Sequence, residues 1–206
     1  SWGIHAEPFS DGISDDALRN ALDRAAEKGP VKLVYVETPA NPTNAMVDLA
    51  MTRRVVDGWA SDCDTPLIVC DNTMLGPVFS SPLDLGADIV VTSLTKYVGG
   101  HSDLVAGSVS GKKRFIDAIR ALRNTMGGIT DPNTAWMLLR SLETVELRME
   151  RAGKNAEKVC AFLKSHPKVE GLGYLGMIED ARQQVEAVVA VLRLGAGREV
   201  EVLTLH

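Results

Sequence analysis

The alternation of short apolar runs with amphipathic segments constrains the fold of this chain more than any other feature. The apolar runs cover residues 31–36, 67–70, 87–91 and 104–109. Apolar residues also recur at helical spacing over residues 15–28, 47–60 and 115–122. Continuous apolar runs are typical of strands that are covered on both faces in a parallel sheet. Strands interleaved with helices predict an α/β domain whose mostly parallel sheet is sandwiched by helices.

The second part of the chain has a different pattern. Asp131 is placed to cap a helix, and helical character then persists to about Ser165. A helix of that length spans roughly 50 Å, which is long enough to connect two lobes. We expect it to kink or break near Gly153. The chain therefore divides into a large domain over residues 1–130 and, over 131–206, a long connecting helix with part of a small C-terminal domain.

Composition and charge exclude several classes of partner. The chain has 206 residues, 45% of them apolar, so it can bury a sizeable core. The net charge is −5 and the basic residues are scattered, which argues against nucleic acid and membrane as partners and favours a small molecule. No segment is long and apolar enough to span a membrane, and residues 1–9 lack the pattern of a signal peptide. The chain starts in the middle of this pattern, so we expect that preceding sequence is absent.

The cysteines and histidines give no sign of a metal or disulfide framework. The three cysteines are odd in number and show no CxxC spacing, which favours a reducing, cytoplasmic compartment. His101 and Asp103 are two residues apart, but no third ligand lies nearby in the sequence, so we expect no metal site.

Polar side chains follow three of the apolar runs, where each predicted strand ends. They lie at residues 37–41, 71–72 and 93–96, and they supply carboxylates, hydroxyls and an amine. In open α/β sheets, ligands bind at the carboxyl ends of the strands. A pyridine aldehyde phosphate needs an amine for its aldehyde, an anion for its ring nitrogen and donors for its phosphate. This set of residue types suits such a ligand.

Three sequence words carry a resemblance to a known family. They are ETPANP at 37–42, DNT at 71–73 and DIVVTSLTKYVGGHS at 88–102. In this order they resemble the pyridoxal-phosphate enzymes of cysteine and methionine metabolism, which include cystathionine γ-synthase, cystathionine γ-lyase and methionine γ-lyase. The resemblance extends from about residue 30 to residue 184, and Leu94 departs mildly from it. It implies an aspartate-aminotransferase-like domain of fold type I, here incomplete.

The resemblance also implies a role for each candidate site residue. Lys96 would form a Schiff base with pyridoxal 5′-phosphate and would later move protons between substrate carbons. Asp71 would keep the ring nitrogen protonated. Ser93 and Thr95 would donate hydrogen bonds to the phosphate, and Asn41 would contact the phenolic oxygen of the ring.

Each of these residues also has a plain structural interpretation. A lysine in a loop is usually a solvated charge, and Asp71 could cap the turn after a strand. Ser93 and Thr95 could bond local backbone groups. Asn41 precedes a proline, so an ordinary turn is as good an interpretation as a cofactor contact.

The activity that the resemblance implies is carbon–sulfur lysis or γ-replacement on a sulfur-containing amino acid such as cystathionine, methionine or an O-acylhomoserine, in transsulfuration. It further implies a homodimer or a homotetramer of two active dimers. Two alternatives remain open: a non-catalytic fragment that keeps only the fold and an oligomer interface, and a pyridoxal-phosphate aminotransferase.

Several segments of the family have no counterpart here. The family's ring-stacking aromatic residue, glycine-containing phosphate turn and substrate-carboxylate arginine are not found, and residues 185–206 are atypical and expected to be foreign to the fold. We therefore expect weak cofactor binding and poor turnover, because phosphate charge that is not compensated is costly to bind. Arg140 and Arg148 could face solvent or a neighbouring subunit.

Overall fold

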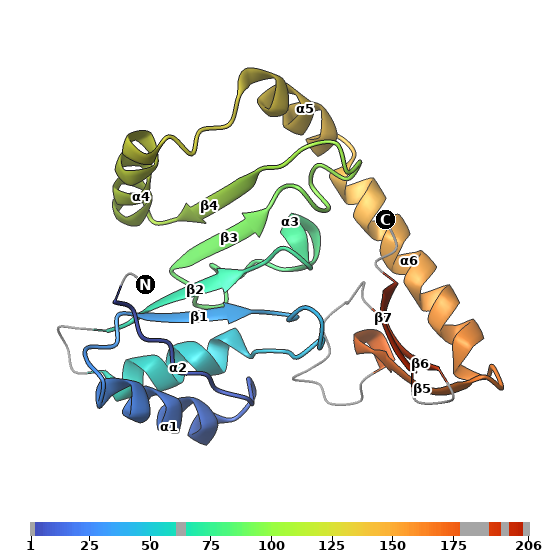
Figure 1. Ribbon diagram of the computed structural model, residues 1–206, viewed down its shortest axis with the longest axis horizontal. Coiled ribbons are helices and arrows are strands. Elements are labelled where there is room, and N and C mark those ends of the chain that lie inside the picture. Colours follow the sequence, from blue (N-terminus) through green and yellow to red (C-terminus); the bar gives the residue numbers. More distant parts are fainter. Residues whose placement is uncertain (1–2, 61–64, 178–189, 195–197, 204–206) are drawn as a thin grey trace.

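The computed structural model describes residues 3–60, 65–177, 190–194 and 198–203. Two sheets and six α-helices are formed by these residues, and α6 leads from the first sheet to the second and runs alongside the second (Figure 1). The helices are α1 (Asp15–Ala26), α2 (Leu49–Trp59), α3 (Gly76–Phe79), α4 (Lys113–Met126), α5 (Pro132–Leu142) and α6 (Val145–Lys164). The strands are β1 (Leu33–Glu37), β2 (Leu67–Asp71), β3 (Ile89–Ser93), β4 (Gly107–Gly111), β5 (Val169–Tyr174), β6 (Ala190–Leu194) and β7 (Arg198–Leu203).

The first sheet has the strand order β1-β2-β3-β4. β1, β2 and β3 run parallel, with Glu37 opposite Asp71 and Asp71 opposite Val91. β4 pairs antiparallel with β3. The segment 94–106 that joins them contains no helix, and a parallel pair would need a crossover, which is usually helical. The sheet is mostly parallel, as predicted, with one antiparallel edge strand.

Side-chain caps fix where the main helices begin. Ser14 Oγ accepts a hydrogen bond from Ala17 N at 3.2 Å, and Asp48 Oδ1 accepts one from Met51 N at 2.9 Å. Asp131 Oδ1 accepts from the backbone of α5 at 2.9 and 3.0 Å, as the sequence predicted. These caps satisfy donors that the first turn of a helix leaves unpaired.

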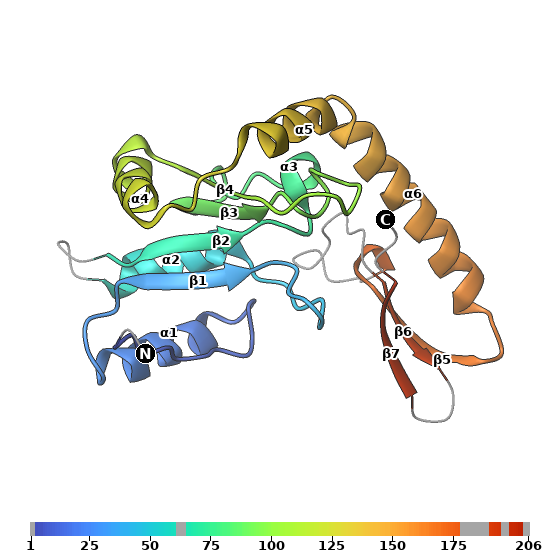
Figure 2. The same ribbon diagram turned by 45° about the horizontal axis from the view of Figure 1, so that its top comes forward.

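The core of the first sheet lies under α1 and α2, which cover one face together (Figure 2). Their apolar side chains pack against the inward residues of β1, β2 and β3, among them Val36, Ile68 and Val90. On the opposite face of β1, Leu33 and Tyr35 are 48% and 53% exposed. The prediction that the run at 67–70 is covered on both faces therefore holds at the centre of β2, whereas β1, an edge strand of the described sheet, has one exposed face.

The long helix breaks at a different place from the one predicted. α5 ends at Leu142 and α6 begins at Val145, whereas Gly153 lies inside α6. A glycine in a helix costs only about 1 kcal/mol relative to alanine. Packing outweighs that cost, because α6 buries Met149 and Cys160 on either side of Gly153.

The second sheet has the order β5-β6-β7 and is antiparallel throughout. β5 packs against α6 through Ala156, Cys160 and Tyr174. Two stretches of the predicted atypical tail, β6 and β7, belong to this sheet, while 185–189, 195–197 and 204–206 lie outside the described residues. No helix in the described part of the chain is both long and apolar enough to cross a membrane.

Candidate active site

The carboxyl ends of β2 and β3 meet through a chain of hydrogen bonds. Asn72 N donates to Val91 O at 2.9 Å, which extends the strand pairing one residue past Asp71. Thr73 N donates to Asp71 Oδ1 at 2.9 Å, and Thr73 Oγ1 accepts from Ser93 N at 2.8 Å. Thr73 thus links the carboxylate at the end of β2 to the end of β3. This bridging role has no signal in the sequence beyond its place in the DNT word.

Lys96 lies in the turn that follows β3. Its backbone N–H donates to Ser93 O at 3.3 Å, and its carbonyl accepts from Gly100 N at 2.7 Å. The side chains of Tyr97 and Val98, the next two residues of the turn, are buried and hold the turn against the protein. The Lys96 side chain is exposed and makes no hydrogen bond or ion pair with any described residue. Its amine is therefore accessible and uncommitted.

Asp71 is half-buried and contacts two donors. In addition to Thr73 N, Tyr35 Oη donates to Asp71 Oδ2 at 3.3 Å. Burial raises the pKa of Tyr35, and the negative charge of Asp71 raises it further, so Tyr35 stays a neutral donor. Each carboxylate oxygen can accept a second bond. Asp71 can therefore hold a cationic N–H group while remaining oriented by its neighbours.

The three weaker candidates differ in what their side chains already contact. The Thr95 hydroxyl donates to Ala106 O at 3.2 Å and accepts from Ala106 N at 3.0 Å, so its single proton is used by backbone. The Ser93 hydroxyl has no partner among the described residues. Asn41 is exposed in a turn closed by a bond from Asn44 N to Ala40 O at 2.8 Å. The structure thus places Asp71 and Ser93 at the neighbouring ends of β2 and β3, with Lys96 in the turn that follows β3.

Arg148 is a site residue whose role the sequence left open. Its guanidinium donates to Tyr97 O at 2.6 Å and to Val98 O at 2.9 Å, so it binds the turn that carries Lys96. Arg140, by contrast, is exposed on α5. In the sequence, the only sign of this role is that Arg148 precedes the apolar Met149. Met149 is buried, so this part of α6 faces the protein interior.

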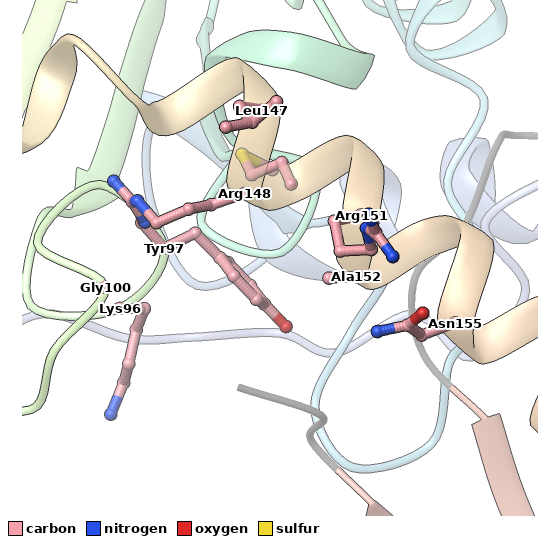
Figure 3. Close-up of a pocket in the computed structure, with 9 residues that line it drawn as sticks. Lys96, Tyr97, Gly100, Leu147, Arg148, Arg151, Ala152 and Asn155 are labelled. Carbon is pink, nitrogen blue, oxygen red and sulfur yellow. The ribbon is translucent and has the colours of Figure 1, made fainter.

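A cavity of about 360 Å³ lies between the Lys96 turn and α6. Lys96 and Tyr97 line it from the turn, and Arg151 and Asn155 line it from the helix (Figure 3). Figure 3 shows the Lys96 side chain extending away from α6. Lys96 is thus shared between the cavity and the end of the sheet, whereas Asp71 and Ser93 do not line the cavity.

The described residues contain no candidate metal site. No group of three or more His, Cys, Asp or Glu side chains among the described residues could hold an ion. His101 Nδ1 lies 2.8 Å from Gly99 O, a local backbone contact.

Comparison with known proteins gives the family. The profile of the family described as "Cys/Met metabolism PLP-dependent enzyme" matches residues 9–195. The chain belongs to this family. The match begins before residue 30 and ends after residue 184, so the limits inferred from the sequence words were too narrow.

Its relatives share both sequence and fold. The chain is 40% identical over 171 residues to L-methionine gamma-lyase of Treponema denticola, covering 82% of this chain and 41% of that protein. It is 40% identical over 163 residues to cystathionine gamma-lyase of Bacillus subtilis, covering 79% and 41%. The crystal structure of cystathionine gamma-lyase from Lactobacillus plantarum complexed with L-serine matches with a TM-score of 0.80 at 32% identity, covering 91% of this chain and 49% of that one. The chain thus spans less than half the length of these relatives.

The family's cofactor is pyridoxal phosphate, and the donor set fits it. Lys96 offers an amine without a partner among the described residues, and Asp71 offers a carboxylate with free acceptor capacity. Ser93 offers a hydroxyl at the end of the neighbouring strand. These are the groups that a pyridine aldehyde phosphate requires.

Proposed function

We propose that the protein acts in sulfur amino-acid metabolism as a pyridoxal-phosphate carbon–sulfur lyase or γ-replacement enzyme. The observation that carries the proposal is the uncommitted amine of Lys96, in the turn after β3, together with the carboxylate of Asp71 at the adjoining end of β2. Family membership and relatives named as γ-lyases support this choice among cofactor chemistries. The substrate class is an amino acid that carries sulfur or an activated oxygen on its side chain.

Each residue has a defined task in this proposal. When bound, the cofactor supplies an electron sink for the substrate α-carbon. Lys96 Nζ would hold the cofactor through its aldehyde group and would serve as the base for the proton on the substrate α-carbon. Asp71 accepts a hydrogen bond from the protonated ring nitrogen. Tyr35 and Thr73 keep the carboxylate in place while it does so.

The remaining contacts are to the phosphate and the ring oxygen. The Ser93 hydroxyl would donate a hydrogen bond to the phosphate, and the Thr95 hydroxyl could do so only by giving up its bond to Ala106 O. The side-chain amide of Asn41 would donate a hydrogen bond to the phenolic oxygen. Because Thr95 already has two backbone partners, replacing Ser93 is expected to weaken phosphate binding more than replacing Thr95.

Self-association in the cytoplasm, as a homodimer or homotetramer, is part of the proposal. Large apolar side chains are exposed along α5 and the start of α6: Trp136, Leu139, Leu142 and Leu147. An exposed apolar set of this kind is typical of a protein interface.

An absorbance measurement tests the proposal. Pyridoxal 5′-phosphate added to the purified chain is expected to give the visible band of a lysine-bound cofactor, and Lys96→Ala should abolish it. Lys158→Ala is the matched control, because Lys158 is an exposed lysine on α6 that makes no hydrogen bond or ion pair with a described residue. Absence of the band in the wild type, or its persistence in Lys96→Ala, would refute the proposal.

Product analysis then separates the remaining functions. With cystathionine, methionine or an O-acylhomoserine, an eliminating enzyme forms a 2-oxo acid and ammonia without any amino acceptor. Formation that depends on an acceptor would indicate an aminotransferase. A visible band without any product would indicate a fragment that retains only the fold and cofactor attachment, and slow turnover is the result we expect for this chain.

A further inference from the structure

Arg148 joins two parts of the chain that are distant in sequence. Toward the Lys96 turn it donates from Nη1 to Tyr97 O at 2.6 Å and from Nη2 to Val98 O at 2.9 Å. Toward the α5–α6 junction it donates from Nη2 to Ser141 O at 2.9 Å and from Nε to Thr144 Oγ1 at 3.1 Å. One guanidinium therefore binds the carbonyls of both segments, and no acidic side chain pairs with it among the described residues.

The turn is shaped to receive this guanidinium. Gly100 has φ +75°, and a Cβ at that position would lie 2.7 Å from Arg148 Cζ. The backbone at Gly100 therefore approaches the guanidinium more closely than any side chain would allow. Figure 3 shows Arg148 reaching from α6 toward the turn, beside Tyr97.

Partial burial makes these bonds costly to lose. Burial lowers the pKa of Arg148, because part of its solvation is removed. The carbonyls of Tyr97 and Val98 follow Lys96 directly in the chain, and both side chains are buried. Removing the guanidinium would leave these acceptors without their donor, in a place where water has limited access.

We propose that Arg148 is a positioning residue that fixes the Lys96 turn against the junction of α5 and α6. This inference rests on the proposed function, because it concerns how the cofactor-bearing lysine is held. Arg148 touches no reacting atom in this account. It acts through the backbone of residues 97 and 98, and it ties the orientation of Lys96 to the helix that packs on the second sheet.

The test uses three variants of the whole chain with pyridoxal 5′-phosphate as the probe. Arg148→Met removes the donors but keeps an apolar stem, and Arg148→Lys restores a single donor nitrogen. Lys154→Met is the matched control, because it removes a cation on the same helix whose 3.1 Å bond to Glu150 is exposed. Every variant must first show native far-UV circular dichroism. We then measure cofactor affinity, the visible circular dichroism per bound cofactor, and amide hydrogen exchange in the absence of cofactor.

Arg148→Met is expected to weaken cofactor binding about tenfold or more, since one hydrogen bond from a charged group is worth roughly that factor. The visible circular dichroism per bound cofactor should fall, and Arg148→Lys should recover part of both losses. Lys154→Met should match the wild type. Wild-type affinity and dichroism in Arg148→Met would overturn the inference and leave the proposed function standing.

Hydrogen exchange keeps the inference testable if the proposed function itself fails. In the cofactor-free protein, Arg148→Met should speed exchange of the Gly99 and Gly100 amides, which bond Leu94 O and Lys96 O at 2.8 and 2.7 Å. Unchanged exchange would overturn the inference. A wild type without a visible band would refute only the proposed function.

Discussion

Cys70 and Asp71 are neighbours on β2, and Cys70 is more deeply buried than Asp71. Cys70 is fully buried, and burial, with a smaller contribution from Asp71, raises the pKa of its thiol to about 12. Because the thiolate is the reactive form, Cys70 should resist iodoacetamide in the native protein at mildly alkaline pH and react only after unfolding. Peptide mapping of the alkylated cysteines measures this. Rapid native modification of Cys70 would contradict its burial.

Gly100 and Gly58 provide a matched pair for backbone strain. Gly100→Ala places a Cβ at positive φ and against Arg148, so it should destabilise the protein by about 1–3 kcal/mol. Gly58 lies near the end of α2, where an added Cβ would meet no atom within 4 Å, so Gly58→Ala should stabilise by up to about 1 kcal/mol. Urea unfolding measures both. Equal effects of the two substitutions would show that the Arg148 contact does not constrain Gly100.

The sequence predicted that Asp71 and Ser93 lie at strand ends and that Lys96 follows closely, because each comes after an apolar run; their joint contact with a cofactor stays a prediction. The plain interpretation of Thr95, a bond to nearby backbone groups, agrees with the bonds to Ala106. The sequence did not predict the bonds of Arg148 to the Lys96 turn, because these join residues about 50 positions apart and leave no periodic or spacing signal. For Asn41, the structure shows only that the residue lies in an exposed turn, so its contact with the cofactor ring stays a prediction.

Among the elements, α2 depends on its cap. Asp48 accepts a bond from Met51 N at 2.9 Å, so Asp48→Ala should lower the free energy of unfolding by about 1 kcal/mol. Asp84→Ala is the control, because Asp84 is exposed and its carboxylate contacts no described group. Thermal unfolding of the two variants gives the comparison. A loss in Asp84→Ala as large as that in Asp48→Ala would mean that charge, and not capping, is responsible.

The starts of α1 and α5 and the approximate positions of β1, β2 and β3 were predictable because capping residues and apolar runs are local signals. β4 (Gly107–Gly111) overlaps the predicted run at 104–109 only in part. Two further features of the elements could not be predicted. The break after Leu142 depends on packing and on bonds to Arg148 rather than on Gly153, and the antiparallel direction of β4 follows from the helix-free connection over 94–106.

At the scale of the molecule, the stability of the first sheet is concentrated on the face that α1 and α2 cover. Ile68 is 0% exposed in this core, so Ile68→Ala should cost about 2–5 kcal/mol. Leu33, on the neighbouring strand, faces away from the core, and Leu33→Ala should cost much less. Denaturant unfolding of both variants tests this asymmetry. A cost at Leu33 similar to that at Ile68 would indicate that the second face is covered in solution.

Attachment of the cofactor to Lys96 is the claim on which the whole account depends. Incubation of the chain with pyridoxal 5′-phosphate, reduction with borohydride and peptide mapping by mass spectrometry test it directly. We expect one dominant pyridoxyl-lysine, at Lys96, and its loss in Lys96→Ala. Labelling spread over exposed lysines such as Lys154 and Lys158, with no preference for Lys96, would contradict it.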